Sequence, residues 1–109
     1  MQKYILVTGG TKGIGRAIIE KFAAEGFHII TCARSEKDLE ALKIAIERDF
    51  TFSKVHYLPV DLGLENERNA FLKFVKDLQV KIDVLVNNTG IFIPGKIIEE
   101  ADDVLPQQM

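Results

Sequence analysis

One segment near the N-terminus determines the architecture of this chain: Tyr4-Ile5-Leu6-Val7-Thr8-Gly9-Gly10-Thr11-Lys12-Gly13-Ile14-Gly15. Its first four residues are a continuous apolar run, as expected of a strand that is buried on both faces of a parallel sheet. Residues 8–15 read as a glycine-rich turn, after which Ile14, Ala17, Ile18 and Phe22 recur at helical spacing. A strand, a glycine-rich turn and a helix N-terminus in this order form a geometry that can hold a dinucleotide pyrophosphate.

The rest of the chain continues to alternate strand and helix patterns. Further strands are expected over residues 27–33, 55–60 and 82–86. Ser35 and Asp38 resemble a capping box for a second helix, and Phe71, Phe74, Val75 and Leu78 give a third helix its apolar face. The order βαβαβαβ requires a parallel sheet with right-handed crossovers. We therefore predict an α/β fold, with one domain over residues 1–109.

Composition narrows the class of protein. The chain has 109 residues, of which 47% are hydrophobic and 28% are charged, as in a globular domain. Its net charge of −2 gives no basis for binding nucleic acid or an anionic membrane, and no apolar run is long enough for a membrane span. The single cysteine, Cys32, excludes an internal disulfide and fits a reducing compartment, so a cytoplasmic location is expected.

Each glycine of the turn can have its own task. Gly9 can make the tight turn, Gly13 can let the backbone approach a phosphate, and Gly15 can let the helix pack close to the strand. The alternative is a tight turn that needs glycine only for a positive φ. Thr11 can donate a hydrogen bond to a phosphate.

Three motifs together resemble those of the short-chain dehydrogenase/reductase family. Residues 8–15 match its signature T-G-x-x-x-G-I-G at every fixed position, Ile14 included. Asp61-Leu62 follows the third predicted strand, where the family has an aspartate-hydrophobic pair. Asn87-Asn88-Thr89-Gly90 follows the fourth and resembles N-N-A-G, with threonine in place of the usual alanine.

The resemblance implies a Rossmann-type doubly wound parallel sheet, here truncated after about four βα units. It also implies that Asp61 and Leu62 contact the adenine of a nicotinamide cofactor. Asn88 and Gly90 are then expected along the cofactor, near its ribose and nicotinamide. Without the resemblance, Asp61 could be only a helix cap or turn residue, and the asparagines only turn-formers.

The end of the second strand bears on which cofactor is bound. A protein selective for NAD usually has a carboxylate there, but this chain has Ala33 followed by Arg34 and Ser35. Arg34 and Lys12 can attract the 2′-phosphate of NADP, and Ser35 can donate a hydrogen bond to it. The alternative is that both cations are ordinary solvated charges. We expect NADP, with NAD less favoured.

No residue is nominated as catalytic. The family is associated with a serine, Tyr-x-x-x-Lys and an assisting asparagine, but Thr8 and Asp61 stand four places after Tyr4 and Tyr57. We therefore expect the N-terminal, cofactor-binding part of a longer NADP-dependent oxidoreductase, with an open flank on its fourth strand. The resemblance implies hydride transfer between NADPH and a small carbonyl or alcohol substrate, in a homo-oligomer. The alternatives are a non-catalytic NADP-binding module and an inactive truncated remnant.

Overall fold

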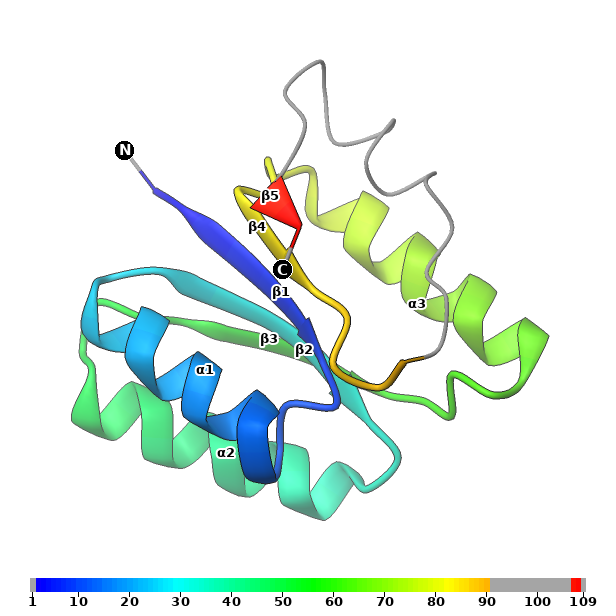
Figure 1. The fold of residues 1–109 in the computed structure, drawn as a ribbon, viewed down its shortest axis with the longest axis horizontal. Helices are drawn as coiled ribbons and strands as arrows, with labels where there is room; N and C mark the ends of the chain where they lie inside the picture. Colours follow the sequence, from blue (N-terminus) through cyan, green and yellow to red (C-terminus); the bar gives the residue numbers. More distant parts are fainter. Residues whose placement is uncertain (1, 91–106, 109) are drawn as a thin grey trace.

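A computed structural model describes residues 2–90 and 107–108 of the chain, which form a parallel sheet with helices on both faces (Figure 1). The predicted α/β class is confirmed, and every predicted strand and helix is present with small shifts at its ends. The elements are β1 (Tyr4–Thr8), α1 (Gly13–Ala24), β2 (His28–Ala33), α2 (Glu36–Asp49), β3 (Val55–Pro59), α3 (Glu65–Leu78), β4 (Val84–Val86) and β5 (Gln107–Gln108).

The sheet has the strand order β3-β2-β1-β4-β5, and all its pairs are parallel. Ile5 on the central strand β1 pairs with Ile29 of β2 on one side and with Val84 of β4 on the other. The outer flank of β4 is not left open as predicted, because Gln107 and Gln108 pair with Val84 and Leu85. A two-residue strand of glutamines carries no apolar pattern that would have revealed it.

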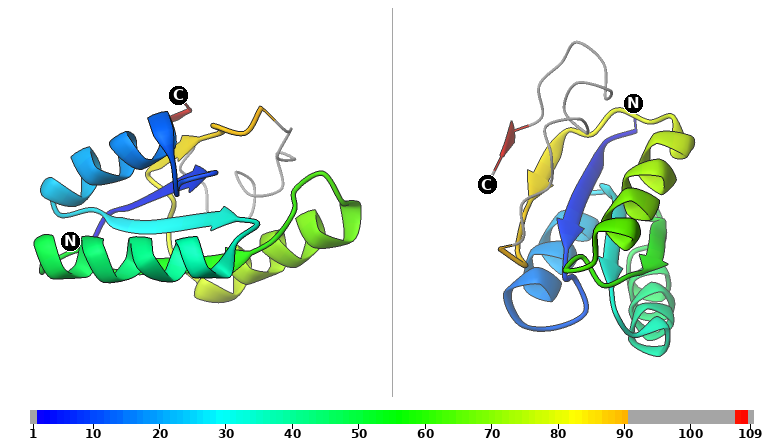
Figure 2. Two further views of the ribbon diagram at one scale, coloured as in Figure 1. Left: turned by 90° about the horizontal axis from the view of Figure 1, so that it is seen from below. Right: turned by 90° about the vertical axis from the view of Figure 1, so that its right-hand side faces the viewer.

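Successive residues of the central strands supply two separate cores. Leu6, Ile30 and Leu85 face α3, where they pack with Phe71 and Val75. Neighbouring residues such as Ile5, Val7 and Ile29 belong to a second core that includes side chains of α1 and α2. Figures 1 and 2 show the resulting three layers, with α1 and α2 on one face of the sheet and α3 on the other. Burial on both faces explains the continuous apolar runs of the strands.

The buried face of α1 differs from the predicted one by about one residue. Gly15, Ile19 and Ala23 are its buried positions, whereas Ala17 is exposed and the side chain of Ile14 is 73% exposed. The first turn of α1 lies so close to the glycine turn that only a residue without a side chain fits between them. This residue is Gly15. A search for apolar side chains cannot find such a position.

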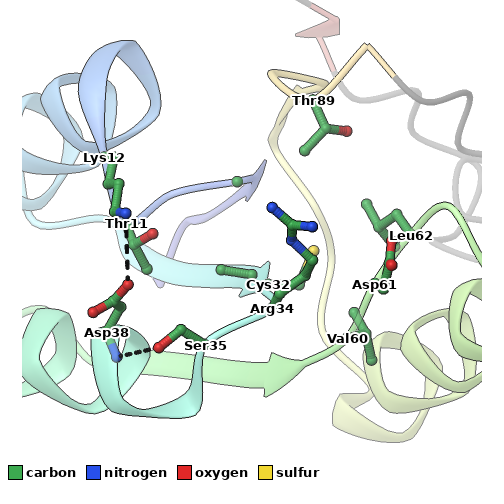
Figure 3. A pocket seen from close by; sticks show the side chains of 12 residues that line it. Thr11, Lys12, Cys32, Arg34, Ser35, Asp38, Val60, Asp61, Leu62 and Thr89 are labelled. Atoms are coloured by element: carbon green, nitrogen blue, oxygen red, sulfur yellow. Dashed lines mark hydrogen bonds and ion pairs between the residues drawn. The ribbon is translucent and has the colours of Figure 1, made fainter.

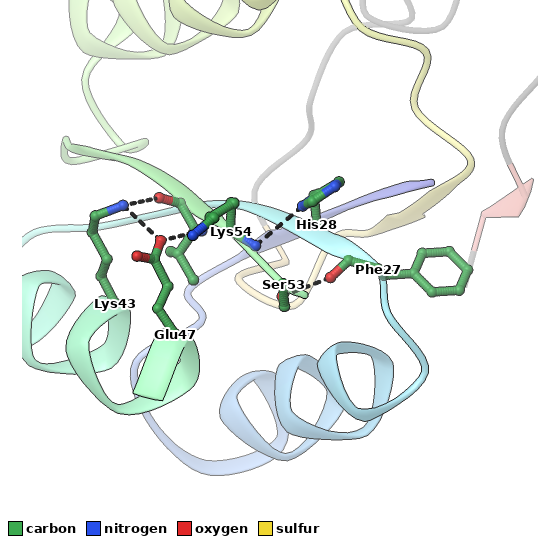
Figure 4. Close-up of polar contacts among 7 residues, drawn as sticks. Phe27, His28, Lys43, Glu47, Ser53 and Lys54 are labelled. Atoms are coloured by element: carbon green, nitrogen blue, oxygen red, sulfur yellow. Dashed lines mark hydrogen bonds and ion pairs between the residues drawn. The ribbon is translucent and has the colours of Figure 1, made fainter. Parts of the chain in front are cut away.

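Charged groups join α2 to β3 at the edge of the sheet (Figure 4). Glu47 Oε2 accepts hydrogen bonds from Lys43 Nζ at 2.7 Å and from the backbone nitrogen of Val55 at 2.9 Å. Partial burial of Glu47 opposes its ionisation, but these two donors outweigh it and hold the pKa of its carboxyl below the ordinary value. The ionised carboxylate thus fixes the start of β3 against α2.

The same edge contains two histidines. His28 is buried, and its Nδ1 accepts a hydrogen bond of 3.1 Å from the backbone nitrogen of Lys54 (Figure 4). Burial, and then the positive charge of Lys43, hold the pKa of His56 below its ordinary value of 6.5. Both side chains serve the packing of β2 and β3 at the end of the sheet away from the glycine turn.

None of the helices in the described part of the chain has the length and apolar character needed to span a bilayer.

Candidate functional site

A pocket of about 510 Å³ opens at the carboxyl ends of the strands, beside the glycine turn (Figure 3). In parallel α/β sheets, ligands bind at this end, where the strand order reverses, which here is between β1 and β4. The pocket is lined by Gly9, Thr11, Lys12, Cys32, Ala33, Arg34, Ser35, Asp38, Val60, Asp61, Leu62 and Thr89.

The glycine turn is shaped by backbone constraints. Gly9 has a φ of +66°, in the left-handed region that favours glycine. A Cβ on Gly15 would collide with the carbonyl oxygen of Gly9 and would lie 2.7 Å from Nδ2 of Asn88. Gly15 therefore allows close packing, as predicted, but against the turn and Asn88 rather than against the strand itself.

Hydrogen bonds tie the turn after β4 to the turn after β1. Asn88 Nδ2 donates to the carbonyl oxygen of Gly9 at 3.2 Å. Thr8 Oγ1 donates to Asn87 Oδ1 at 3.2 Å and accepts from the backbone nitrogen of Thr89, also at 3.2 Å. These hydrogen bonds join the two loops at the rim of the pocket.

Cations gather at one end of the pocket, where β2 leads into α2. The Arg34 guanidinium projects into the pocket, and Lys12 approaches from the start of α1 (Figure 3). Among residues 2–90, no side chain forms an ion pair with Arg34, whereas Lys12 Nζ lies 4.0 Å from Asp38 Oδ2. Ser35 caps α2 through its Oγ, which accepts from the backbone nitrogen of Asp38 at 3.1 Å and keeps its own hydrogen to donate.

The opposite end of the pocket contains the loop after β3. Asp61 Oδ1 accepts a hydrogen bond from the backbone nitrogen of Gly63 at 2.8 Å, as in an Asx-turn. Glu67 Oε1 accepts from the backbone nitrogen of Asp61 at 2.7 Å, and Arg68 Nη1 donates to the carbonyl oxygen of Leu62 at 2.8 Å. The first turns of α3 thus hold this loop in place. Asp61 forms the turn and lines the pocket at once.

Cys32 lies under the floor of the pocket. Its side chain is buried, and burial raises the pKa of the thiol to about 11, although a hydrogen bond from the Gly9 backbone acts in the opposite direction. A thiol with this pKa stays protonated near neutral pH and is a poor nucleophile. Within the described residues, no group of three or more His, Cys, Asp and Glu side chains could hold a metal ion.

The structure brings most of the predicted site residues to this one pocket. Its walls include Gly9, Thr11, Lys12, Arg34, Ser35, Asp61 and Leu62. Five others do not line it, namely Gly13, Ile14, Gly15, Asn88 and Gly90. These lie along the first turn of α1 and in the loop after β4.

The site prediction did not include Cys32, Ala33, Asp38, Val60 and Thr89, which also line the pocket. Val60 and Ala33 could have been expected, since they end or follow predicted strands whose carboxyl ends meet there. Asp38 reaches the pocket through the geometry of the first turn of α2, and the sequence pattern carries no signal for that.

With this geometry in view, comparison with known proteins identifies the family. The short chain dehydrogenase family matches residues 3–109, which is almost the whole sequence. The chain belongs to the short-chain dehydrogenase family. The resemblance carried by the three motifs is thereby confirmed.

Individual relatives agree with this assignment. A tropinone reductase homolog of Arabidopsis thaliana is 43% identical over 90 residues, which cover 81% of this chain and 33% of the relative. The solved structure of L-sorbose reductase from Gluconobacter frateurii, in complex with NADPH and L-sorbose, is 34% identical with a TM-score of 0.75 and covers 82% of this chain. The NADPH-dependent reductase YwfH, of bacilysin biosynthesis, is 26% identical with a TM-score of 0.75 and 81% coverage. The chain spans about a third of the length of these three proteins.

Proposed function

We propose that this chain is the cofactor-binding part of an NADP-dependent oxidoreductase. In the complete protein, hydride would pass between NADPH and a small carbonyl or alcohol substrate. The observation that carries the proposal is the Arg34 guanidinium in the pocket, beside Ala33 where an NAD-selective protein usually has a carboxylate. Without an ion-pair partner among the described residues, this guanidinium can bind a phosphate with little competition. Two related reductases support the same cofactor, since L-sorbose reductase binds NADPH and YwfH is NADPH-dependent.

The glycine turn fits the pyrophosphate of such a cofactor. Lys12 is the N-cap of α1, and its side chain makes no capping hydrogen bond. The first backbone amides of α1 are therefore not occupied by the capping side chain and can donate to a bound anion. A Cβ on Gly13 would meet no atom within 4 Å, which leaves space above this part of the turn. Thr11 and the backbone around Ile14 and Gly15 complete the proposed cradle.

The other predicted residues extend the proposed site along the cofactor. Asp61 and Leu62 would contact the adenine, with Arg34, Lys12 and Ser35 around the 2′-phosphate. Asn88 and Gly90 would lie near the nicotinamide ribose. When bound, NADPH supplies the hydride, while the residues of this chain bind and orient the cofactor. The cytoplasmic location and the homo-oligomer stay predictions, and sedimentation of the complete protein would test the second.

Substitution of Arg34 tests the proposed cofactor. We expect Arg34→Ala to weaken NADPH binding by about tenfold or more, because a charge-assisted contact to phosphate is lost. Binding of NADH, which has no 2′-phosphate, should change by less than about twofold. Arg48→Ala is the matched control, since Arg48 lies in the last turn of α2 and pairs with Asp49 at 3.0 Å. Equal losses for NADPH and NADH in Arg34→Ala would contradict the proposal.

A further inference from the structure

The cationic end of the pocket also contains a carboxylate. Asp38 lines the same wall as Lys12, Arg34 and Ser35, and its Oδ2 lies 4.0 Å from Lys12 Nζ (Figure 3). The Lys12 side chain is 83% exposed and that of Asp38 is 43% exposed. Such an exposed pair is weak, so a stronger anion can displace Asp38 from Lys12.

Asp38 is held in this position by its place in α2. It stands in the first turn of the helix, and its backbone nitrogen donates to the capping oxygen of Ser35 at 3.1 Å. The N-terminal turn of a helix attracts negative charge, which stabilises a carboxylate there. A phosphate bound at Arg34 and Ser35 would therefore find Lys12 already paired with a carboxylate at the same helix end.

We infer that Asp38 limits the preference of this chain for a 2′-phosphate by competing with that phosphate for Lys12. The inference rests on the proposed NADP site and assigns a specificity-determining role to a residue outside the predicted site. With NADP bound, Lys12 must exchange Asp38 for the phosphate, so the pair between Lys12 and Asp38 is lost. With NAD bound, the pair between Lys12 and Asp38 persists. Asp38 therefore weakens NADP binding without weakening NAD binding.

A neighbouring glutamate supplies a matched control. Glu36 carries the same charge in the same first turn of α2. It does not line the cofactor pocket and instead borders a separate hollow with Lys37, Glu40, Ala41 and Ile44. A general effect of charge at the start of α2 would appear equally in Asp38→Asn and Glu36→Gln, whereas competition for Lys12 would appear only in Asp38→Asn.

The test compares adenosine 2′,5′-bisphosphate with adenosine 5′-monophosphate, which differ only in the 2′-phosphate. We expect Asp38→Asn to bind the bisphosphate about fivefold more tightly than the wild type, with less than about a twofold change for the monophosphate. Glu36→Gln should leave both affinities within about twofold. The gain should shrink at high salt, because ions screen exposed charges. Thermal unfolding of each variant checks that α2 is intact.

A Lys12→Gln background then tests the competition itself. If Asp38 acts by holding Lys12, adding Asp38→Asn to Lys12→Gln should change the affinity for the bisphosphate by less than about twofold. A full gain in this background, an unchanged ratio in Asp38→Asn, or an equal gain in Glu36→Gln would overturn the inference. A wild-type protein that binds the bisphosphate no better than the monophosphate would instead overturn the proposed NADP site itself.

Discussion

Thr89 Oγ1 lies 3.3 Å from Oγ1 of Thr8, although the two residues are far apart in the sequence. Thr89 stands where related motifs have alanine, and its hydroxyl also donates to Asn87 Oδ1 at 3.3 Å. Thr8 is fully buried at the end of β1, so its hydroxyl is the point at which the central strand holds the loop after β4.

Removal of this hydroxyl should destabilise the protein. Thr8→Val keeps the shape of the side chain but removes the acceptor of the Thr89 backbone nitrogen and one of the two hydroxyl donors to Asn87 Oδ1. We expect the free energy of unfolding in urea to fall by about 1–3 kcal/mol, the cost of unsatisfied polar groups. Thr51→Val, at an exposed turn, should change it by less than about 0.5 kcal/mol. An equal effect of the two substitutions would contradict the role of Thr8.

The strands were the most predictable part of the fold. Burial on both faces forces the central strands to be continuously apolar, and such runs are visible in the sequence. The inward face of α1 was predicted only in part: Ile18 and Phe22 pack against the core, but Gly15 and not Ile14 is buried in the first turn. At Gly15, the close approach of the helix to the glycine turn excludes a side chain, so the residue type is determined by space and not by hydrophobicity.

The residues of the candidate site could be predicted where they belong to a sequence motif or a strand end. They could not be predicted where only the three-dimensional structure places them at the pocket. Arg34, Lys12 and Asp61 follow from strand ends and the glycine turn, and the structure brings all three to one pocket. Asp38 reaches the same pocket through the first turn of α2, and Thr89 lies there with its hydroxyl against that of Thr8. The sequence pattern gives no signal for either position, since the first depends on the geometry of one helix turn and the second on how β1 and β4 lie side by side.

The free energy of unfolding should decrease as the pH is lowered through the range where His56 titrates. Because its pKa in the folded protein is below the ordinary value of 6.5, the unfolded chain takes up the proton more readily. The contribution of neutral His56 to the free energy of unfolding is therefore complete above pH 6.5. It is lost as the pH falls through the lower pKa of His56 in the folded state. Urea unfolding at about pH 7 and about pH 5 should show this loss.

The His56→Gln variant isolates that contribution, because it removes the titrating group and leaves His28 in place. Its free energy of unfolding should fall less than that of the wild type over the same pH range. The lowered pKa of Glu47 adds a separate loss of stability, but only at more acidic pH, below its ordinary value of 4.5. Identical pH profiles of the wild type and His56→Gln would refute the assignment.

The thiol of Cys32 should be unreactive in the folded protein. With a pKa of about 11 and a buried side chain, it offers almost no thiolate near neutral pH. We expect a disulfide reagent such as dithionitrobenzoate to modify it only as fast as the protein opens, and immediately in denaturant. Rapid modification of the native protein, without loss of its secondary structure, would contradict the burial of the Cys32 thiol.

The most direct test of the central claim is an NMR titration of this chain with NADPH and, in parallel, with NADH. Amide shifts report weak as well as tight binding and identify the residues involved. We predict saturable shifts at Lys12, Arg34 and Ser35, and an affinity for NADPH about tenfold higher than for NADH. Equal or tighter binding of NADH, or NADPH-induced shifts that leave these three residues unaffected, would contradict an NADP site in this pocket.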